Sequence, residues 1–170
     1  YKDHTCGPRQ VRLKIFHKGE PITLSDALPI LENMGLRTIS ELPFSVRPAG
    51  ACAPVWIHDF LMAIKNPAFP DFNKSTTETK LRFEEDFIRL WYGEAENDTL
   101  NQLVLGAGLD WRAIVVLRAY VRYLRQTANP FGKMYMESAL TRHPAIAQLF
   151  INLFAARFDP ARSNKRDEKI

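Results

Sequence analysis

The spacing of the apolar residues changes once along this chain of 170 residues, and this change constrains the fold more than any other feature. Before residue 65, apolar and polar side chains alternate in short stretches, as they do in half-buried β-strands. From Lys80 onward, apolar residues recur every three or four positions, which is typical of amphipathic helices. The intervening residues 65–79 are rich in proline, serine and threonine and predict a loop. We therefore expect an α+β protein whose strands are confined to the first part.

The first part begins with a strand and a helix. Residues 11–15 alternate between apolar and basic side chains and predict a strand, which a turn at residues 17–21 ends. Thr23 or Ser25 can cap the following helix, and Gly35 suits the left-handed position just after it. We expect the apolar face of this helix to consist of Leu24, Leu28 and Leu31.

Two further strands complete the first part. One begins at Leu36 and carries Leu42, Phe44 and Val46 in phase. Pro43 within it cannot donate a ladder hydrogen bond and indicates an edge strand or a bulge. Residues 55–62 are apolar on both faces, as in a central strand. The predicted order is therefore strand, helix, strand, strand.

The first helix of the second part begins at Lys80. Arg82 and Asp86, like Glu85 and Arg89, are spaced four residues apart and predict ion pairs on the solvent-facing side. The opposite side is apolar and is formed by Phe83, Phe87 and Leu90, joined by Ile88 and Trp91.

Capping residues mark the helices that follow. Asp98 can cap a short helix that Gly106 and Gly108 end, and Asp110 can cap the next one. Pro144 suits the first turn of the last helix, which follows a shorter one. We expect two buried helix faces here, one formed by Ile114, Leu117, Val121 and Leu124, and one formed by Ile146, Leu149, Phe150, Leu153 and Phe154.

The composition is that of a soluble globular protein, with 46% apolar and 25% charged residues. It excludes a disulfide scaffold, a collagen-like repeat and a largely disordered chain. No apolar run approaches the roughly 20 residues of a membrane span. Cys6 and Cys52 suit a reducing compartment, so we expect a cytoplasmic protein.

The net charge of +4 is spread unevenly. Residues 59–108 hold nine acids and five bases, whereas residues 109–170 hold five acids and eleven bases. Such asymmetry is found in proteins that bind nucleic acid or membranes. No cluster of bases is dense enough to act alone, however, so complementary surfaces within one protein are the favoured interpretation.

The sequence contains no convincing catalytic, cofactor-binding or metal-binding residues. Gly106 and Gly108 begin like a dinucleotide-binding fingerprint, but Trp111 stands at the third glycine position and no strand precedes them. His4 with Cys6 does not belong to a second pair at metal-site spacing. His58 and Asp59, adjacent in a strand, point to opposite faces and cannot form a local acid–base pair.

Three arginines form a cationic ridge on one predicted helix. Arg118, Arg122 and Arg125 lie four and three residues apart, with Tyr123 nearby. Guanidinium groups suit phosphates, so this ridge supports an alternative function as a nucleic-acid-binding module. They suit carboxylates equally well, and we favour packing against an acidic neighbour. The candidate neighbours are Glu84, Glu85 and Glu96.

Several stretches together resemble the large NAD-specific glutamate dehydrogenases of bacteria. The resemblance runs in consistent order from Val11 to about Pro160 and is weak in residues 1–10 and 65–80. The stretches that carry it are 12–16, 19–21, 24–26, 28–37, 55–60, 95–98, 101–105, 118–120, 123–126, 143–144 and 153–160.

The resemblance implies an organisation in two parts. Residues 1–93 would form an ACT-like βαββα module, residues 94–160 a helical segment, and residues 161–170 a charged, disordered tail. An ACT-like module would have a fourth strand, which the sequence does not show. ACT-like modules often bind amino-acid effectors in the loop after the first strand, here near Gly19, although the usual Asp-x-Pro-Gly pattern is absent.

The resemblance also implies a function. The family oxidatively deaminates L-glutamate to 2-oxoglutarate with NAD, and its regulatory modules precede the catalytic domain. The family's nucleotide loop and catalytic lysine have no matching positions here. We therefore expect a non-catalytic regulatory and scaffolding fragment, inactive alone, from a cytoplasmic, homo-oligomeric enzyme that binds NAD in another domain. Its partners would be other domains of the same chain.

Overall fold

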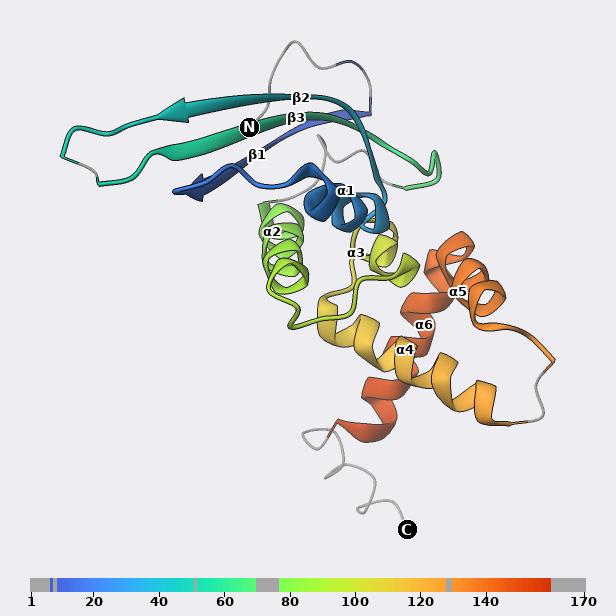
Figure 1. Cartoon of the computed structure of the whole chain (residues 1–170). Coiled ribbons are helices and arrows are strands. Elements are labelled where there is room, and N and C mark those ends of the chain that lie inside the picture. Colours follow the sequence, from blue (N-terminus) through green and yellow to red (C-terminus); the bar gives the residue numbers. More distant parts are fainter. Residues whose placement is uncertain (1–6, 8, 51, 70–76, 128–129, 160–170) are drawn as a thin grey trace.

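The computed structural model describes residues 7, 9–50, 52–69, 77–127 and 130–159 (Figure 1). The predicted strand, helix, strand, strand order is confirmed, and so is the α+β class, because only helices follow in the described part of the chain. The first part consists of β1 (Gln10–Lys18), α1 (Leu24–Asn33), β2 (Leu36–Val46) and β3 (Val55–Ile64). The three strands form an antiparallel sheet in the order β1-β3-β2.

The central position of β3, which its two-sided apolar sequence predicts, is confirmed. His58 of this strand lies opposite Ile15 of β1 and Pro43 of β2. The edge position of β2 is also confirmed, and an edge is where proline is tolerated. The one irregularity in its pairing lies between Thr38 and Ser40 rather than at Pro43.

The two faces of the sheet have different surroundings. The helices lie on one side (Figure 1), where Val11, Phe60 and Met62 are buried. On the other face, Phe16 and Phe44 are exposed although they are apolar. Within the described residues the sheet has three strands, so the fourth strand of an ACT-like module is not found among them.

The predicted apolar face of α1 is confirmed in part. Leu31 is fully buried, whereas Leu24 is 39% exposed, and Ala27, which was not predicted, is also fully buried. The buried face centres on Ala27, whose small side chain permits close packing. Thr23 is the N-cap residue, although its side chain makes no capping hydrogen bond. Gly35 adopts a left-handed φ of +90°, as predicted for the residue that follows a helix.

The second part is helical throughout its described residues. Its first helix begins at Thr77 rather than at Lys80. Both predicted aspartate caps are confirmed, because Asp98 Oδ1 accepts from the backbone N–H of Leu100 and Asp110 Oδ1 from that of Ala113. The elements are α2 (Thr77–Trp91), the 3₁₀ helix η2 (Thr99–Gln102), α3 (Leu103–Ala107), α4 (Trp111–Gln126), α5 (Lys133–Arg142) and α6 (Pro144–Phe158).

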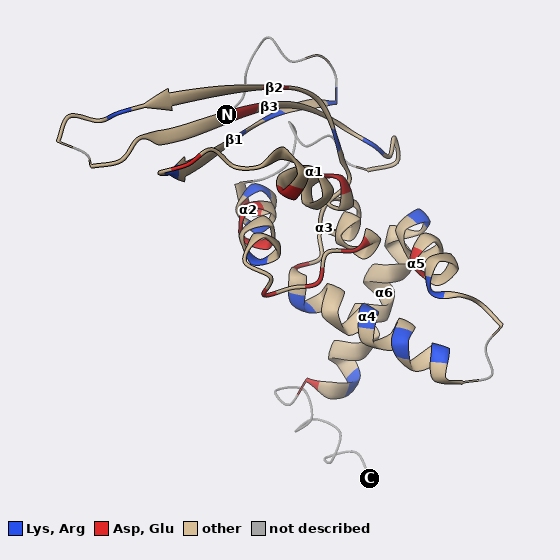
Figure 2. Ribbon diagram, viewed as in Figure 1, with Lys and Arg blue, Asp and Glu red and all other residues tan. Residues whose placement is uncertain are grey.

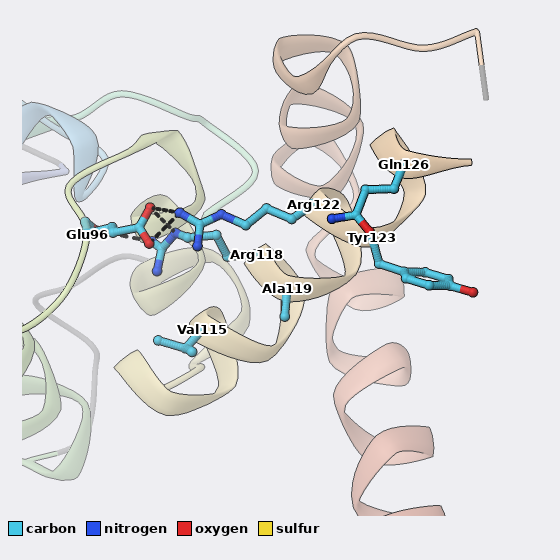
Figure 3. A pocket seen from close by; sticks show the side chains of 7 residues that line it. All are labelled: Glu96, Val115, Arg118, Ala119, Arg122, Tyr123 and Gln126. Atoms are coloured by element: carbon cyan, nitrogen blue, oxygen red, sulfur yellow. Dashed lines mark hydrogen bonds and ion pairs between the residues drawn. The ribbon is translucent and has the colours of Figure 1, made fainter. Parts of the chain in front are cut away.

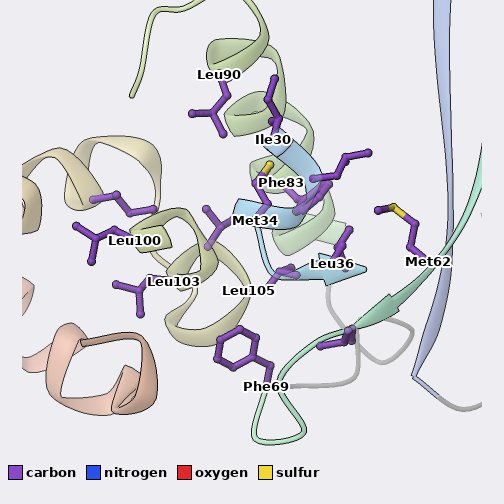
Figure 4. Packing of buried hydrophobic residues seen from close by; sticks show 14 of the residues in the cluster. Ile30, Met34, Leu36, Met62, Phe69, Phe83, Leu90, Leu100, Leu103 and Leu105 are labelled. Atoms are coloured by element: carbon purple, nitrogen blue, oxygen red, sulfur yellow. The ribbon is translucent and has the colours of Figure 1, made fainter. Parts of the chain in front are cut away.

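Most buried apolar residues of both parts form one continuous cluster. Figure 4 shows Met34 and Leu36, next to the sheet, in the same cluster as Leu100 and Leu103 of the helical part. Each such fully buried side chain contributes about 1.5–3 kcal/mol. On α4 the predicted seam is confirmed for Ile114, Leu117 and Val121, but Leu124 is partly exposed.

The predicted inward face of α6 is wrong. Ile146, Leu149, Phe150 and Leu153 are exposed, and Ala147 is the buried residue of this helix. The physical reason lies in the sequence of α6, which is apolar on nearly every side, so that spacing alone does not identify the side that packs against α3, α4 and α5.

No helix among the described residues is long and apolar enough to cross a membrane. The predicted tail at residues 161–170 lies outside the described residues.

Candidate functional site

The arginine ridge of α4 begins with Arg118, whose side chain is buried. Its guanidinium binds both carboxylate oxygens of Asp98, with Nε 2.6 Å from Oδ2 and Nη2 3.0 Å from Oδ1. Nη2 also donates to the backbone carbonyl of Glu96 and to Oδ1 of Asn101. A bidentate, buried pair of this kind fixes geometry. Arg118 therefore holds α4 against the segment that precedes η2.

The second arginine of the ridge also has an acidic partner. Arg122 Nη2 lies 2.6 Å from both carboxylate oxygens of Glu96. Both residues line one groove together with Arg118 (Figure 3). The predicted acidic neighbour is thus confirmed as Glu96, while Asp98 was missed. Glu85 instead pairs with Arg89, as the spacing on α2 predicted. With two of its three cations matched to carboxylates, the ridge does not favour the alternative function in nucleic-acid binding.

The loop between β1 and α1, where an effector was predicted near Gly19, is held by groups of the protein itself. Trp56 Nε1 donates to the carbonyl of Gly19, and the N–H of Gly19 donates to the carbonyl of Pro54. His17 Nδ1 lies 2.7 Å from the carbonyl of Glu20. An effector that bound this backbone would have to replace these hydrogen bonds.

A buried histidine fixes the end of the same loop. The N–H of Ile22 donates to Nε2 of His58, so Nε2 is the acceptor and the ring proton sits on Nδ1. Nδ1 then donates to Oε1 of Glu41 at 2.7 Å. His58 is therefore the neutral Nδ1–H tautomer, and it links the loop to β3 and β2.

His58 and Asp59 point to opposite faces of the sheet, as predicted. Asp59 faces Arg12 and Lys14, each 3.6 Å away. Within the described part of the chain, no three His, Cys, Asp or Glu side chains are grouped as a metal site would require. His4 and Cys6 lie outside the described residues.

The glycine pair at residues 106 and 108 has a packing role. The ring of Phe69, which follows β3, lies against Gly106 of α3, and a Cβ on that glycine would stand 2.6 Å from Phe69 Cε1. A Cβ on Gly35 would stand 3.3 Å from Cε2 of the same ring. Gly108 adopts a left-handed φ of +64° at the end of α3. These glycines permit a close junction between the sheet part and the helical part.

Three residues on one face of α2 complete this junction. Arg82 donates to the carbonyl of Gly108, Asp86 Oδ1 accepts from the N–H of Trp111, and the Arg89 guanidinium lies 4.8 Å from the centre of the Trp111 ring. Because these positions are four and three residues apart, they form one row along α2. The row attaches α2 to the turn that begins α4.

The prediction that Asp86 pairs with Arg82 on the solvent-facing side is wrong. Asp86 is only 2% exposed, and Arg82 pairs with Glu78 instead. The pKa of Asp86 is raised to about 7, chiefly by burial; the Trp111 N–H and Arg82 oppose the shift, and Asp110 and Glu85 add to it. One sequence signal could have located it, because Asp86 falls three residues after Phe83 and four before Leu90, on the apolar stripe.

Together these contacts define an α+β module of ACT type that shares its core with a helical motif. Comparison with protein families gives the same two parts. Residues 1–75 match the glutamate dehydrogenase ACT3 domain, and residues 95–160 match glutamate dehydrogenase helical motif 3. The chain therefore belongs to the glutamate dehydrogenase family.

Similar curated proteins are named NAD-specific glutamate dehydrogenase. The protein from Halomonas elongata is 45% identical over 89% of this chain. Those from Pseudomonas aeruginosa and Mycobacterium tuberculosis are each 39% identical, over 95% and 93% of it. The chain spans only 9–10% of the length of these relatives. The boundary near residue 93 stays a prediction, since α2 lies between the two matched regions.

Proposed function

We propose that this chain is a non-catalytic regulatory and scaffolding segment of a longer, cytoplasmic, homo-oligomeric NAD-dependent glutamate dehydrogenase. The whole enzyme would deaminate L-glutamate to 2-oxoglutarate and bind NAD in a domain outside these residues. The relatives' printed name and the family's two matched motifs support this assignment.

One observation carries the scaffolding part of the proposal. The charged and polar side chains with the lowest exposure in the helical part, Arg118 and Asp86, are used to attach elements to one another. A buried charged group that lacks a partner is costly, and active sites accept that cost in order to hold reactive groups. Here the Arg118 guanidinium donates to Asp98, Glu96 and Asn101, and Asp86 accepts from Trp111 through Oδ1, although its Oδ2 has no hydrogen-bond partner among the described residues. Both side chains therefore hold elements together, as a scaffold requires.

The experiment is calorimetric titration of the isolated chain with NAD, together with an assay of glutamate turnover. We expect neither saturable NAD binding nor turnover, because the nucleotide site would lie elsewhere in the enzyme. Specific, stoichiometric NAD binding with turnover of glutamate would overturn the proposal. An amino-acid effector near Gly19 stays a proposal, and thermal-shift measurements with a panel of amino acids at millimolar concentration test it.

A further inference from the structure

The last helix of the structure has an apolar surface that no other described residue covers. Of the fifteen residues of α6, only Gln148, Asn152 and Arg157 are polar or charged. Helices that are apolar on nearly every side are found in protein interiors, with neighbours all around them. One side of α6 satisfies this rule, because Ala147 is fully buried and the Phe154 ring packs edge-on against Tyr120 at 6.2 Å.

The other side of α6 is exposed. We call it the α6 face and define it by Ile146, Leu149, Phe150 and Leu153, of which Leu149 and Leu153 are 65% and 64% exposed. These residues follow the spacing i, i+3, i+4 and i+7, which aligns them in one stripe along the helix. A stripe of this spacing is the surface that an amphipathic helix buries when it docks.

Basic residues flank the α6 face at both ends. Helix α6 contains no acidic residue, Arg142 lies just before its start, and Arg157 lies in its last turn. Figure 2 shows basic residues on α4, α5 and α6 in this region, together with one acidic residue on α5 and one just after α6. A partner that presents carboxylates beside its apolar stripe would match both ends of the face.

A second copy of this chain fits the α6 face poorly. In an antiparallel pair, Arg142 of each copy would approach Arg157 of the other, and in a parallel pair each arginine would approach its own counterpart. Both arrangements bring like charges together, which destabilises an interface. The relatives are about ten times longer than the matched region, so ample further chain exists to supply another partner.

We propose that the α6 face is the docking site for an amphipathic helix with acidic flanks from another part of the same long polypeptide. This inference rests on the proposed function, in which the chain is one segment of a longer enzyme. The inference specifies that the segment attaches to the rest of the enzyme through the α6 face, and that the partner surface is an apolar helix face with acidic flanks.

The test compares the accessibility of one side chain in two proteins. Leu153→Cys is introduced together with Cys6→Ser into the isolated chain and into the full-length enzyme. Maleimide labelling rates are then read peptide by peptide by mass spectrometry. The exposed Cys52 serves as the internal reference. We expect Cys52 to label at similar rates in both proteins and the cysteine at position 153 to label at least tenfold more slowly in the full-length enzyme.

The alternatives give different results. Equal labelling at position 153 in both proteins would overturn the proposal. Protection that already exists in the isolated chain and fades on dilution would also overturn it, because it would identify a second copy as the partner. Labelling does not depend on activity, so failure here leaves the NAD titration to decide the proposed function separately.

Discussion

At the scale of single residues, the contact with the Phe69 ring explains why glycine stands at position 106, where helix propensity alone favours alanine. Gly106 lies within α3, where glycine costs about 1 kcal/mol relative to alanine. A methyl group at this position would enter the van der Waals volume of the Phe69 ring. The need for space at the junction therefore outweighs helix propensity.

We expect Gly106→Ala to destabilise the chain by about 1–2 kcal/mol, since an overpacking cost of about 1–3 kcal/mol exceeds the gain in helix propensity. Urea unfolding measures this change. The matched control is Phe69→Leu, which removes the ring, and in that background Gly106→Ala should cost less. An equal cost in both backgrounds would show that the ring is not what excludes the methyl group.

At the scale of elements, α2 connects the two parts of the chain, because it packs against α1 and its row Arg82, Asp86 and Arg89 attaches to the turn that begins α4. The carboxyl of Asp86 is the sensitive member, because its surroundings favour the protonated form. Between about pH 4 and pH 7, the folded chain keeps a proton on Asp86 that the unfolded chain has released. The folded state binds more protons in this window, so its stability falls as the pH rises through it.

Asp86→Asn is expected to remove this dependence. The amide retains an oxygen that can accept from Trp111 but does not titrate. The wild-type free energy of unfolding should fall by roughly 1–3 kcal/mol between pH 5 and pH 8, and that fall should shrink in the variant. Urea unfolding across this range measures both slopes, with the exposed Asp26→Asn as the control. Parallel slopes for wild type and Asp86→Asn would show that Asp86 does not cause the pH dependence of stability.

Sequence periodicity predicted the elements well but their neighbours poorly. The alternation of residues 11–15 and the aspartate caps are local features, and local geometry decides them. Whether a helix face is covered depends on which other elements reach it, and local spacing contains no such information. Asp86 and the α6 face show this limit in opposite directions: a carboxylate expected in solvent is buried, and an apolar stripe expected inside is exposed.

The contacts of the arginine ridge on α4 could be predicted from the sequence only in part. Its spacing on α4 and its acidic neighbour Glu96 could be inferred from residue types. The bidentate pair of Arg118 with Asp98 could not, because Asp98 was already explained as a helix cap. One carboxylate performs both roles here, and only the three-dimensional arrangement reveals the second.

At the scale of the whole molecule, the central claim is that the ACT-type module and the helical motif form one body. They share a continuous core, in which the Phe69 ring packs against Gly106, and the α2 row attaches α2 to the turn that begins α4. Two parts that share a core should unfold together, whereas parts joined only by a linker unfold separately.

Pulse-labelling hydrogen exchange during urea unfolding tests this claim most directly. Peptides from β3 report on the ACT-type module and peptides from α4 report on the helical motif. We predict that both lose protection in one transition with the same midpoint. Loss of protection in α4 at a urea concentration where β3 remains fully protected, or the reverse, would contradict the account.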